Sequence, residues 1–281
     1  MARYFIIGSV LLACMASAPR SARAELPQTF NVPSVTDDYR VTYALAFGIW
    51  APDEYCFDHR LGLQLPLWAA ALGAQLSFTN VFGEVDDSGV GNLRLYLQWF
   101  HNFEWARRAN FWIGGGIDGY VPTATAFEPD SDQALLMGSG VAGDSSLNAP
   151  DTTFGLRPRL QIAGQAWIFS VQAFGAAAVQ FVGSEVRVAF EWGINFSADA
   201  TEWLAIVAEL AGVSWTVEPP PWMEPRAVTV GGGLRFNLPG GWMPGVWFRV
   251  PAIGADTARF NDVAYVGLEL TWQHGRNWFL F

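Results

Sequence analysis

The sequence predicts an all-β fold, a single transmembrane antiparallel up-and-down β-barrel of about 12 strands. Three observations support this prediction. Apolar and polar residues alternate with a period of two along many segments, those segments have roughly the 9 to 11 residues of a tilted membrane strand, and only the N-terminus carries a longer apolar run. That run is shorter than the roughly 18 residues that indicate a membrane-spanning helix.

The alternation is clearest between Glu185 and Phe196, where Val, Phe, Trp and Ile alternate with Glu, Arg, Ala, Gly and Asn. The same order recurs in residues 60–67, 92–99 and 263–272. One strand of this kind also suits a soluble sheet, so the prediction of a membrane barrel depends on the repetition. The predicted strands are 40–50, 60–69, 72–82, 90–101, 110–122, 151–164, 167–179, 184–196, 203–217, 226–238, 243–253 and 261–273.

Merging or splitting a hairpin would change the count to 10 or 14 strands. Short links alternate with longer polar ones, as expected for periplasmic turns and external loops. The longer links are predicted at Ala51–His59, Gly83–Gly89, 123–150, Glu218–Pro225 and Gly254–Arg259, and 123–150 is the longest external loop. Two links fit less well: Asn102–Ala109 is long for a periplasmic turn, and Phe181–Gly183 is short for an external loop.

Residues 1–24 read as a signal peptide, with Arg3 before an apolar stretch and Ala22-Arg23-Ala24 as the cleavage pattern. An alternative is lipoprotein cleavage, which would leave Cys14 acylated. The rest, 25–281, is expected to form one barrel domain with a short periplasmic lead at 25–39. Cleavage after residue 24 would leave Cys56 as the only cysteine.

All 16 basic residues are arginine, against 26 acidic ones, and removal of the three arginines in 1–24 changes the formal charge from −10 to −13. This balance argues against nucleic acid as a partner. Aromatic residues make up 15% of the chain, which is typical of a barrel with rings of aromatic side chains at both bilayer interfaces, and outer-membrane lipid is the expected surrounding.

Charged residues within the strands fall on the polar face, because an arginine facing lipid near the midplane would cost about 2 to 4 kcal/mol. Two interpretations stay open: the arginines line a path for solutes with a preference for anions, or they pair with carboxylates as a structural network. The candidate lumen-lining residues are Arg40, Arg60, Arg94, Asp118, Arg157, Arg159, Glu185, Arg187, Glu191, Glu209, Arg235, Arg249 and Glu269.

One stretch, Ser88 to Leu95 followed by Gly114-Gly115-Gly116-Ile117 and Val121-Pro122-Thr123, resembles a family of outer-membrane transporters associated with degradation of aromatic compounds by the phenol meta-pathway. The resemblance covers about a fifth of the chain and implies hydrophobic or aromatic solutes. Asn92 replaces the usual Asp, Gln98-Trp99 replaces a common Lys-Tyr, and Ala124 follows Thr123 in place of Gly. These departures leave the barrel pattern intact and weaken the inference about the solute.

The final predicted strand resembles the signal that the barrel assembly machinery reads in outer-membrane proteins. The residues that carry this resemblance are Tyr265, Gly267, Leu270, Trp272 and Phe281. The resemblance implies the assembly machinery as a partner, and the alternative is an ordinary amphipathic strand.

Enzymatic readings have little support, because His59, His101 and His274 are predicted in a loop, at a strand end and in the tail, where none shares a face with a serine. No metal site or cofactor is predicted. The glycine runs 114–116 and 231–233 lie inside strands, where they indicate curvature or close packing of the wall rather than a phosphate cradle.

The sequence therefore predicts an outer-membrane channel or transporter for small solutes in a Gram-negative bacterium, with hydrophobic or aromatic solutes implied by the family resemblance. One alternative is a barrel without transport that has a structural or surface-interaction role. A second is a lipid hydrolase embedded in the barrel wall, which would need His101 beside a serine. The sequence carries no signal for the oligomeric state or for whether the lumen is open.

Overall fold

The computed structural model describes residues 38–51, 54–67, 70–82, 87–106, 109–123, 154–217, 225–253 and 264–274. The expected signal peptide with Cys14, the lead up to residue 37, residues 124–150 of the predicted external loop, and Phe281 lie outside these ranges. The strands are β1 (Tyr39–Ala51), β2 (Glu54–Leu67), β3 (Ala70–Phe82), β4 (Asp87–Val90), β5 (Leu93–Ala106), β6 (Ala109–Val121), β7 (Phe154–Ala166), β8 (Phe169–Val182), β9 (Glu185–Thr201), β10 (Leu204–Val217), β11 (Arg226–Phe236), β12 (Trp242–Ile253) and β13 (Ala264–His274).

Among the described residues, no helix has the length and apolar character needed to cross a membrane.

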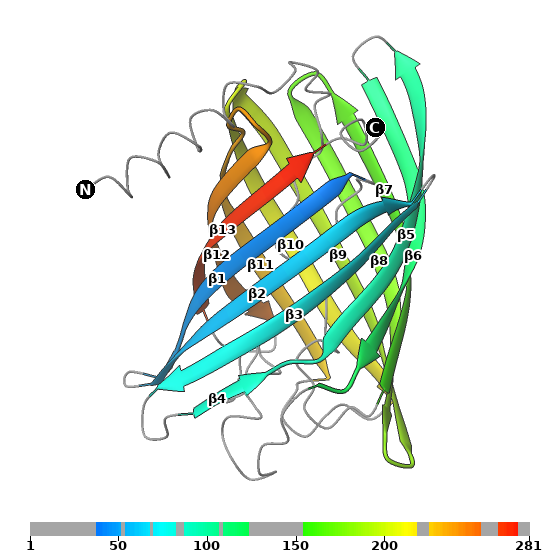
Figure 1. Cartoon of the computed structure of the whole chain (residues 1–281), viewed down its shortest axis with the longest axis vertical. Helices are drawn as coiled ribbons and strands as arrows, with labels where there is room; N and C mark the ends of the chain where they lie inside the picture. Colours follow the sequence, from blue (N-terminus) through cyan, green and yellow to red (C-terminus); the bar gives the residue numbers. More distant parts are fainter. Residues whose placement is uncertain are drawn as a thin grey trace, which may run out of the picture.

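The strands form one closed antiparallel barrel (Figure 1). Each strand is hydrogen-bonded to its neighbour in the chain, except that β4 and β5 both pair with β3. β1 closes the ring by pairing with β13 from Tyr39↔His274 to Ile49↔Ala264. Closure satisfies the backbone N–H and C=O groups that would otherwise face lipid at two free edges. The predicted antiparallel barrel of 12 strands is confirmed, since β4 and β5 share one position beside β3.

The short strand β4 was not predicted as a separate element. It pairs with the end of β3, from Phe78↔Val90 to Val81↔Asp87, and β5 pairs with the beginning of β3, from Ala70↔Trp99 to Gln75↔Arg94. The chain is interrupted between them at Gly91 and Asn92, where the Gly91 N–H donates to the Ser77 carbonyl at 2.9 Å. The predicted strand 90–101 is therefore two pieces in series.

Two predicted links are wrong, because strand structure continues through them. Residues 54–59 belong to β2 rather than to a long loop, and the inward position of Asp58 is stabilised by its ion pair with Arg60 at 2.7 Å. Residues 102–106 belong to β5, and Phe103 packs against Phe111 of β6 with ring centroids 6.2 Å apart. The links at these points are only 52–53 and 107–108.

The two ends of the barrel differ in the length of their links. The end at which β1 begins and β13 ends has links 68–69, 107–108, 167–168, 202–203 and 237–241. The opposite end has 52–53, 83–86, 122–153, 183–184, 218–225 and 254–263. Because external loops are the longer ones in outer-membrane barrels, we call the end with the longest links the outer end and the other the periplasmic end.

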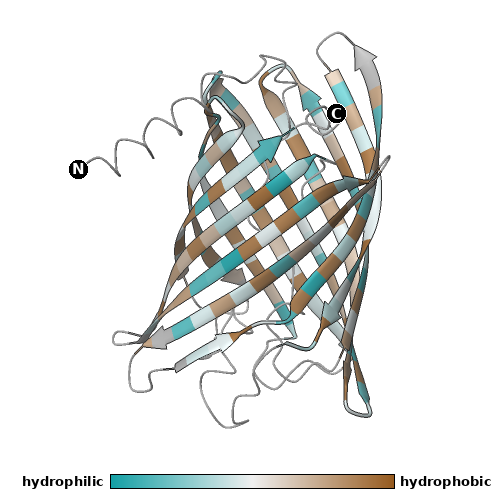
Figure 2. Cartoon of the chain, in the orientation of Figure 1, coloured by the Kyte–Doolittle hydropathy of each residue, from teal (hydrophilic) through white to brown (hydrophobic). Residues whose placement is uncertain are grey.

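Apolar and polar residues alternate along the strands, as bands of colour across the wall show (Figure 2). Along β2, Leu61, Leu63, Leu65 and Leu67 are exposed on the outer wall, whereas the intervening Gln64 is buried. The buried polar residues include glutamine, arginine, aspartate and glutamate, so the interior of the barrel is polar. A soluble protein has the opposite arrangement, whereas a membrane barrel places its apolar face toward lipid.

Aromatic rings meet at both ends of the wall. Tyr55 stacks on Phe82 at 5.6 Å near the outer end, and Trp203 stacks on Phe236 at 6.2 Å near the periplasmic end. Such paired rings at two levels are typical of the aromatic girdles at the membrane interfaces.

Glycines inside the strands make room for large inward side chains. A Cβ on Gly73 would overlap the Tyr96 ring, and a Cβ on Gly116 would lie only 3.0 Å from Nε and Nη2 of Arg159. A Cβ on Gly233 would collide with the Val246 carbonyl. The predicted close packing at 114–116 and 231–233 is confirmed, and at Gly116 it positions a charged residue of the lumen.

Candidate functional site

The candidate site is the inner wall of the barrel. Of the 13 predicted lumen-lining residues, 11 are buried, Arg60 is half-buried and Glu185 is exposed. Glu185 has the inward register of Arg187 but begins β9 directly after the two-residue turn 183–184, so it lies at the outer rim. The remaining 12 lie on the inner wall between the two ends of the barrel.

The centre of the site is the Asp118 cluster, which consists of Asp118, Arg94, Arg157, Arg159 and Glu191. Asp118 is fully buried and accepts hydrogen bonds from Arg94 and Arg157, both at 3.0 Å. It also forms an ion pair with Nε of Arg159 at 3.2 Å. Nε of Arg157 also lies 2.6 Å from Glu191. Three positive charges therefore meet two negative ones, and the cluster carries one excess positive charge.

Register explains why these residues meet. Asp118 on β6 pairs with Arg157 on β7 and with Tyr96 on β5, so their side chains leave the same face of adjacent strands. Arg94 is two residues before Tyr96 and keeps the same face. The sequence alone gives the face of each residue but not these pairings, which depend on strand register.

A series of hydrogen bonds through Gln98 and Gln64, which we call the glutamine belt, extends the Asp118 cluster. Nη2 of Arg159 donates to Oε1 of Gln98 at 2.8 Å, Nε2 of Gln98 donates to Oε1 of Gln64 at 2.9 Å, and the Tyr96 hydroxyl donates to the same Gln64 oxygen at 3.3 Å. These amides are not among the predicted lumen-lining residues. Their signal was present, because a glutamine on the polar face of a membrane strand is as costly to expose to lipid as other polar groups.

Two smaller ion pairs lie elsewhere on the inner wall. Arg235 contacts Glu269 at 3.0 Å, and the Thr271 hydroxyl donates to the same carboxylate at 2.9 Å. Asp58 accepts from Arg60 and from Thr79. Asp58 was missed because residues 51–59 were predicted as a loop.

Arg249 lies between two aromatic rings. Its guanidinium carbon is 4.8 Å from the Tyr265 ring centroid and 6.0 Å from that of Trp247. Tyr265 and Gly267, predicted as part of the assembly signal, thus face inward, whereas Leu270 is on the outer wall. The indole of Trp272 donates to the Gly240 carbonyl at 3.1 Å.

One cavity of about 90 Å³ opens among these side chains, and we call it the Arg159 cavity. It is bounded by residues of seven strands, β1, β2, β3, β5, β7, β12 and β13. Its charged lining consists of four arginines and two carboxylates: Arg40, Arg60, Arg94, Arg159, Asp58 and Glu269.

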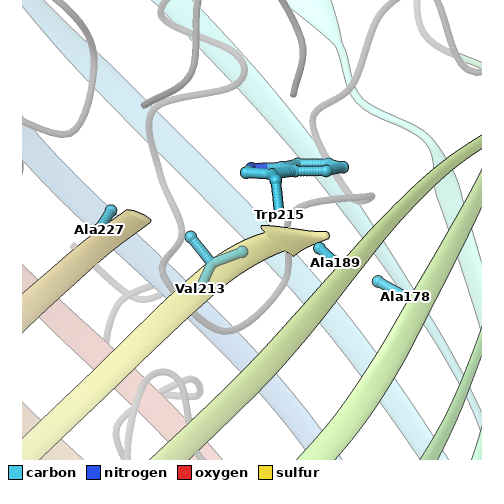
Figure 3. Packing of buried hydrophobic residues seen from close by; sticks show 5 residues of the cluster. All are labelled: Ala178, Ala189, Val213, Trp215 and Ala227. Carbon is cyan, nitrogen blue, oxygen red and sulfur yellow. The ribbon is translucent and has the colours of Figure 1, made fainter. Parts of the chain in front are cut away.

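An apolar patch covers another part of the inner wall. Ala178, Ala189, Val213, Trp215 and Ala227 come from four consecutive strands, β8 to β11, and their side chains stand on the same side of the sheet (Figure 3). Ala176 on β8 pairs with both Arg159 and Glu191, so small apolar residues directly adjoin the Asp118 cluster. The inner wall is therefore polar on one side and partly apolar on the other.

The histidines lie on or near the outer wall. His59 lies on β2, whereas it was predicted in a loop. Its two ring nitrogens are hydrogen-bonded to Tyr43 at 2.8 Å and to Asn80 at 3.4 Å. His101 is exposed and meets the Phe103 ring edge-on at 4.4 Å. Within the described ranges, no serine is hydrogen-bonded to His101, and no group of three His, Cys, Asp or Glu side chains is placed to hold a metal ion.

No known family model matches the sequence, and no curated protein matches it either. Solved outer-membrane channels share its fold. The COG4313 outer membrane channel from Pseudomonas putida F1 superposes with a TM-score of 0.58 at 12% identity, over 89% of this chain and 100% of that one.

Two porins give similar superpositions. NanC porin has a TM-score of 0.52 at 5% identity, covering 83% of this chain and 100% of its own. KdgM porin has a TM-score of 0.50 at 9% identity, covering 84% and 99%. These likenesses show the outer-membrane barrel fold, and they do not identify the phenol meta-pathway family that the sequence resembles.

Proposed function

We propose that the protein is a channel in the outer membrane of a Gram-negative bacterium and conducts small solutes through its lumen. The observation that carries this proposal is the inverted wall: leucines face outward, whereas arginine, glutamine and carboxylate side chains line a closed barrel around the Arg159 cavity. A polar inner wall gives water and dissolved solutes a path that lipid does not. The fold shared with solved channels supports the proposal.

The proposed channel prefers anions. Eight of the 13 predicted lumen residues are arginines, and the Asp118 cluster alone keeps an excess positive charge. A wall with net positive charge raises the local concentration of anions and excludes cations.

Hydrophobic or aromatic solutes, which the sequence resemblance implies, have one matching feature in the lumen. This is the apolar patch around Trp215, because an indole ring and three alanines offer contact to an apolar surface. The proposal for such solutes therefore concerns the side of the lumen formed by β8 to β11.

A barrel that does not transport is the second candidate function. The observation in its favour is the dense network of buried ion pairs, because side chains that neutralise one another can fill a lumen as a structural core. Such a barrel would serve the envelope as a structural or surface-interaction protein.

Single-channel recording in a planar lipid bilayer separates the two candidates. The refolded full-length chain is expected to give steady current steps in potassium chloride. Liposomes that contain the protein are expected to swell in a small permeant solute faster than liposomes without it. Correctly folded protein that gives neither result would refute the channel and favour the structural role.

We also propose that the barrel assembly machinery inserts the protein and recognises the strand that carries Tyr265, Gly267, Leu270 and Trp272, with Phe281. The arrangement of β13, with Leu270 on the outer wall, is compatible with this role. Replacement of Phe281 with alanine is expected to slow insertion by the purified machinery without changing the free energy of unfolding of the inserted barrel. Equal insertion rates would contradict it.

A further inference from the structure

We infer that the Arg159 cavity binds the carboxylate of small solutes that carry a short apolar group. This inference rests on the proposed channel function, because it names the class of solute that the channel would conduct. Three features carry it: a buried guanidinium with an uncommitted N–H group, an excess of positive charge in the lining, and a small apolar surface beside them.

Arg159 supplies the donor. Its Nε contacts Asp118 at 3.2 Å and its Nη2 donates to Gln98 at 2.8 Å, so two of the three nitrogens have partners. Nη1 has no hydrogen-bond acceptor among the described residues, although the side chain is fully buried. A buried donor without an acceptor is costly, and an oxygen of a bound carboxylate would relieve that cost with a charge-assisted hydrogen bond.

The charges of the lining favour an anion. Four arginines face two carboxylates, so the cavity attracts an anion. Each of these carboxylates is already paired, Asp58 with Arg60 at 2.7 Å and Glu269 with Arg235 at 3.0 Å. The remaining positive charge of the lining attracts the carboxylate, and Arg40 and Arg94 lie in the same lining as Arg159.

An apolar part of the lining favours a short apolar group on that carboxylate. Ala44, Ala46 and the Trp247 indole form an apolar part of the lining. The other uncharged lining residues are Thr42, Gly62, Leu63, Gln64, Gln75, Tyr96 and Gln98. Its volume of about 90 Å³ holds roughly six or more water-sized groups, which suits a carboxylate with a chain of a few carbons and not a long fatty acid. Butyrate has this size and chemistry and serves as the probe.

The test measures binding of carboxyl-labelled butyrate to the refolded full-length protein by NMR line broadening, in parallel with current recording. Arg159→Gln removes the donor and the charge, and its expected effect is a loss of affinity of about tenfold or more. Gly62→Val places a side chain in the lining of the cavity, and its Cβ would meet no atom closer than Thr42 Cβ at 3.8 Å. This variant is expected to lose butyrate binding even if Arg159→Gln fails to fold.

Gly119→Val is the matched control. Gly119 alternates with the buried Asp118 and Tyr120 and so faces outward, and a Cβ there would lie 4.0 Å from the Leu95 carbonyl oxygen. The control is expected to bind butyrate as the wild type does. 1-Butanol, which lacks the charge, and inorganic phosphate, which lacks the apolar group, are both expected to bind more weakly than butyrate.

Equal butyrate affinity in wild type and Gly62→Val would overturn the inference, as would phosphate binding at least as tightly as butyrate. Current recording tests the proposed channel function separately from butyrate binding. A protein that conducts but does not bind butyrate refutes the carboxylate site alone. A protein that binds butyrate but does not conduct supports the site and refutes the channel.

Discussion

Asp118 is the residue on which the charges of the lumen depend most. It is fully buried and contacts three arginines, so its removal leaves buried guanidinium groups with Glu191 as the cluster's remaining carboxylate. We expect Asp118→Asn to lower the free energy of unfolding by about 3 to 5 kcal/mol, because loss of one partner from a buried ion pair strands the other charge. Urea titration of the barrel in lipid vesicles measures this loss.

Glu185→Gln is the control for that prediction. Its carboxylate is exposed at the outer rim, and the exchange is expected to change the free energy of unfolding by less than about 1 kcal/mol. Similar losses for the two variants would show that Asp118 does not hold the cluster together.

Gly73 controls the position of the Tyr96 ring. Since a Cβ at Gly73 would overlap that ring, Gly73→Ala forces the ring to move away from Gln64, to which its hydroxyl donates. The expected cost is about 1 to 3 kcal/mol of unfolding free energy, as for other overpacked sites. Gly119→Ala, where the nearest atom would be 4.0 Å away, is expected to be neutral, and equal effects at both positions would refute the role of ring packing.

Each strand has an outward and an inward face, and β13 offers outward positions at two depths in the membrane. Leu268 faces outward at mid-strand, paired with Leu45 and Val246, whereas Ala264 faces outward at the outer end beside Ile49. We expect Leu268→Arg to cost about 2 to 4 kcal/mol and Ala264→Arg about 0 to 1 kcal/mol, because the penalty for a charge falls toward the membrane interface. The free energy of unfolding in vesicles measures both penalties. Equal losses for the two variants would mean that the penalty does not depend on depth in lipid.

At the level of the strands, periodicity predicted nearly every barrel strand and failed where the pattern was short or mixed. Residues 54–59 contain Cys, Asp and His within a few positions, a composition that suggests a loop. The structure explains the strand, because Asp58 contacts Arg60 and Thr79 on the inner face. The break at Gly91 and Asn92 has no signal of its own, because glycine also occurs inside neighbouring strands. Both failures concern tertiary pairing, which local pattern does not record.

The same limit applies to the candidate site. Alternation alone placed Asp118, Arg157 and Glu191 on the inner face, where the structure has them buried. It did not predict that one carboxylate would serve three arginines, because that depends on the register of β5, β6 and β7. Alternation also puts Gln64 and Gln98 on the polar face, because the cost of exposure to lipid applies to uncharged amides as it does to charged groups.

At the level of the whole molecule, the barrel separates two kinds of surface with one alternating chain. The outer wall carries exposed leucines and aromatic rings, and the inner wall carries a cavity whose charged lining is four arginines and two carboxylates. Closure between β1 and β13 makes the inner wall continuous. This separation suits the channel proposed above, and the positive excess is the basis of its proposed preference for anions.

The reversal potential across a planar bilayer under a potassium chloride gradient tests that claim most directly. Our account predicts that the refolded protein conducts and that its reversal potential lies on the chloride side, because the arginine excess favours anions. A reversal potential at zero or on the potassium side would contradict the role of the arginines. Absence of current from correctly folded barrels would contradict the channel itself.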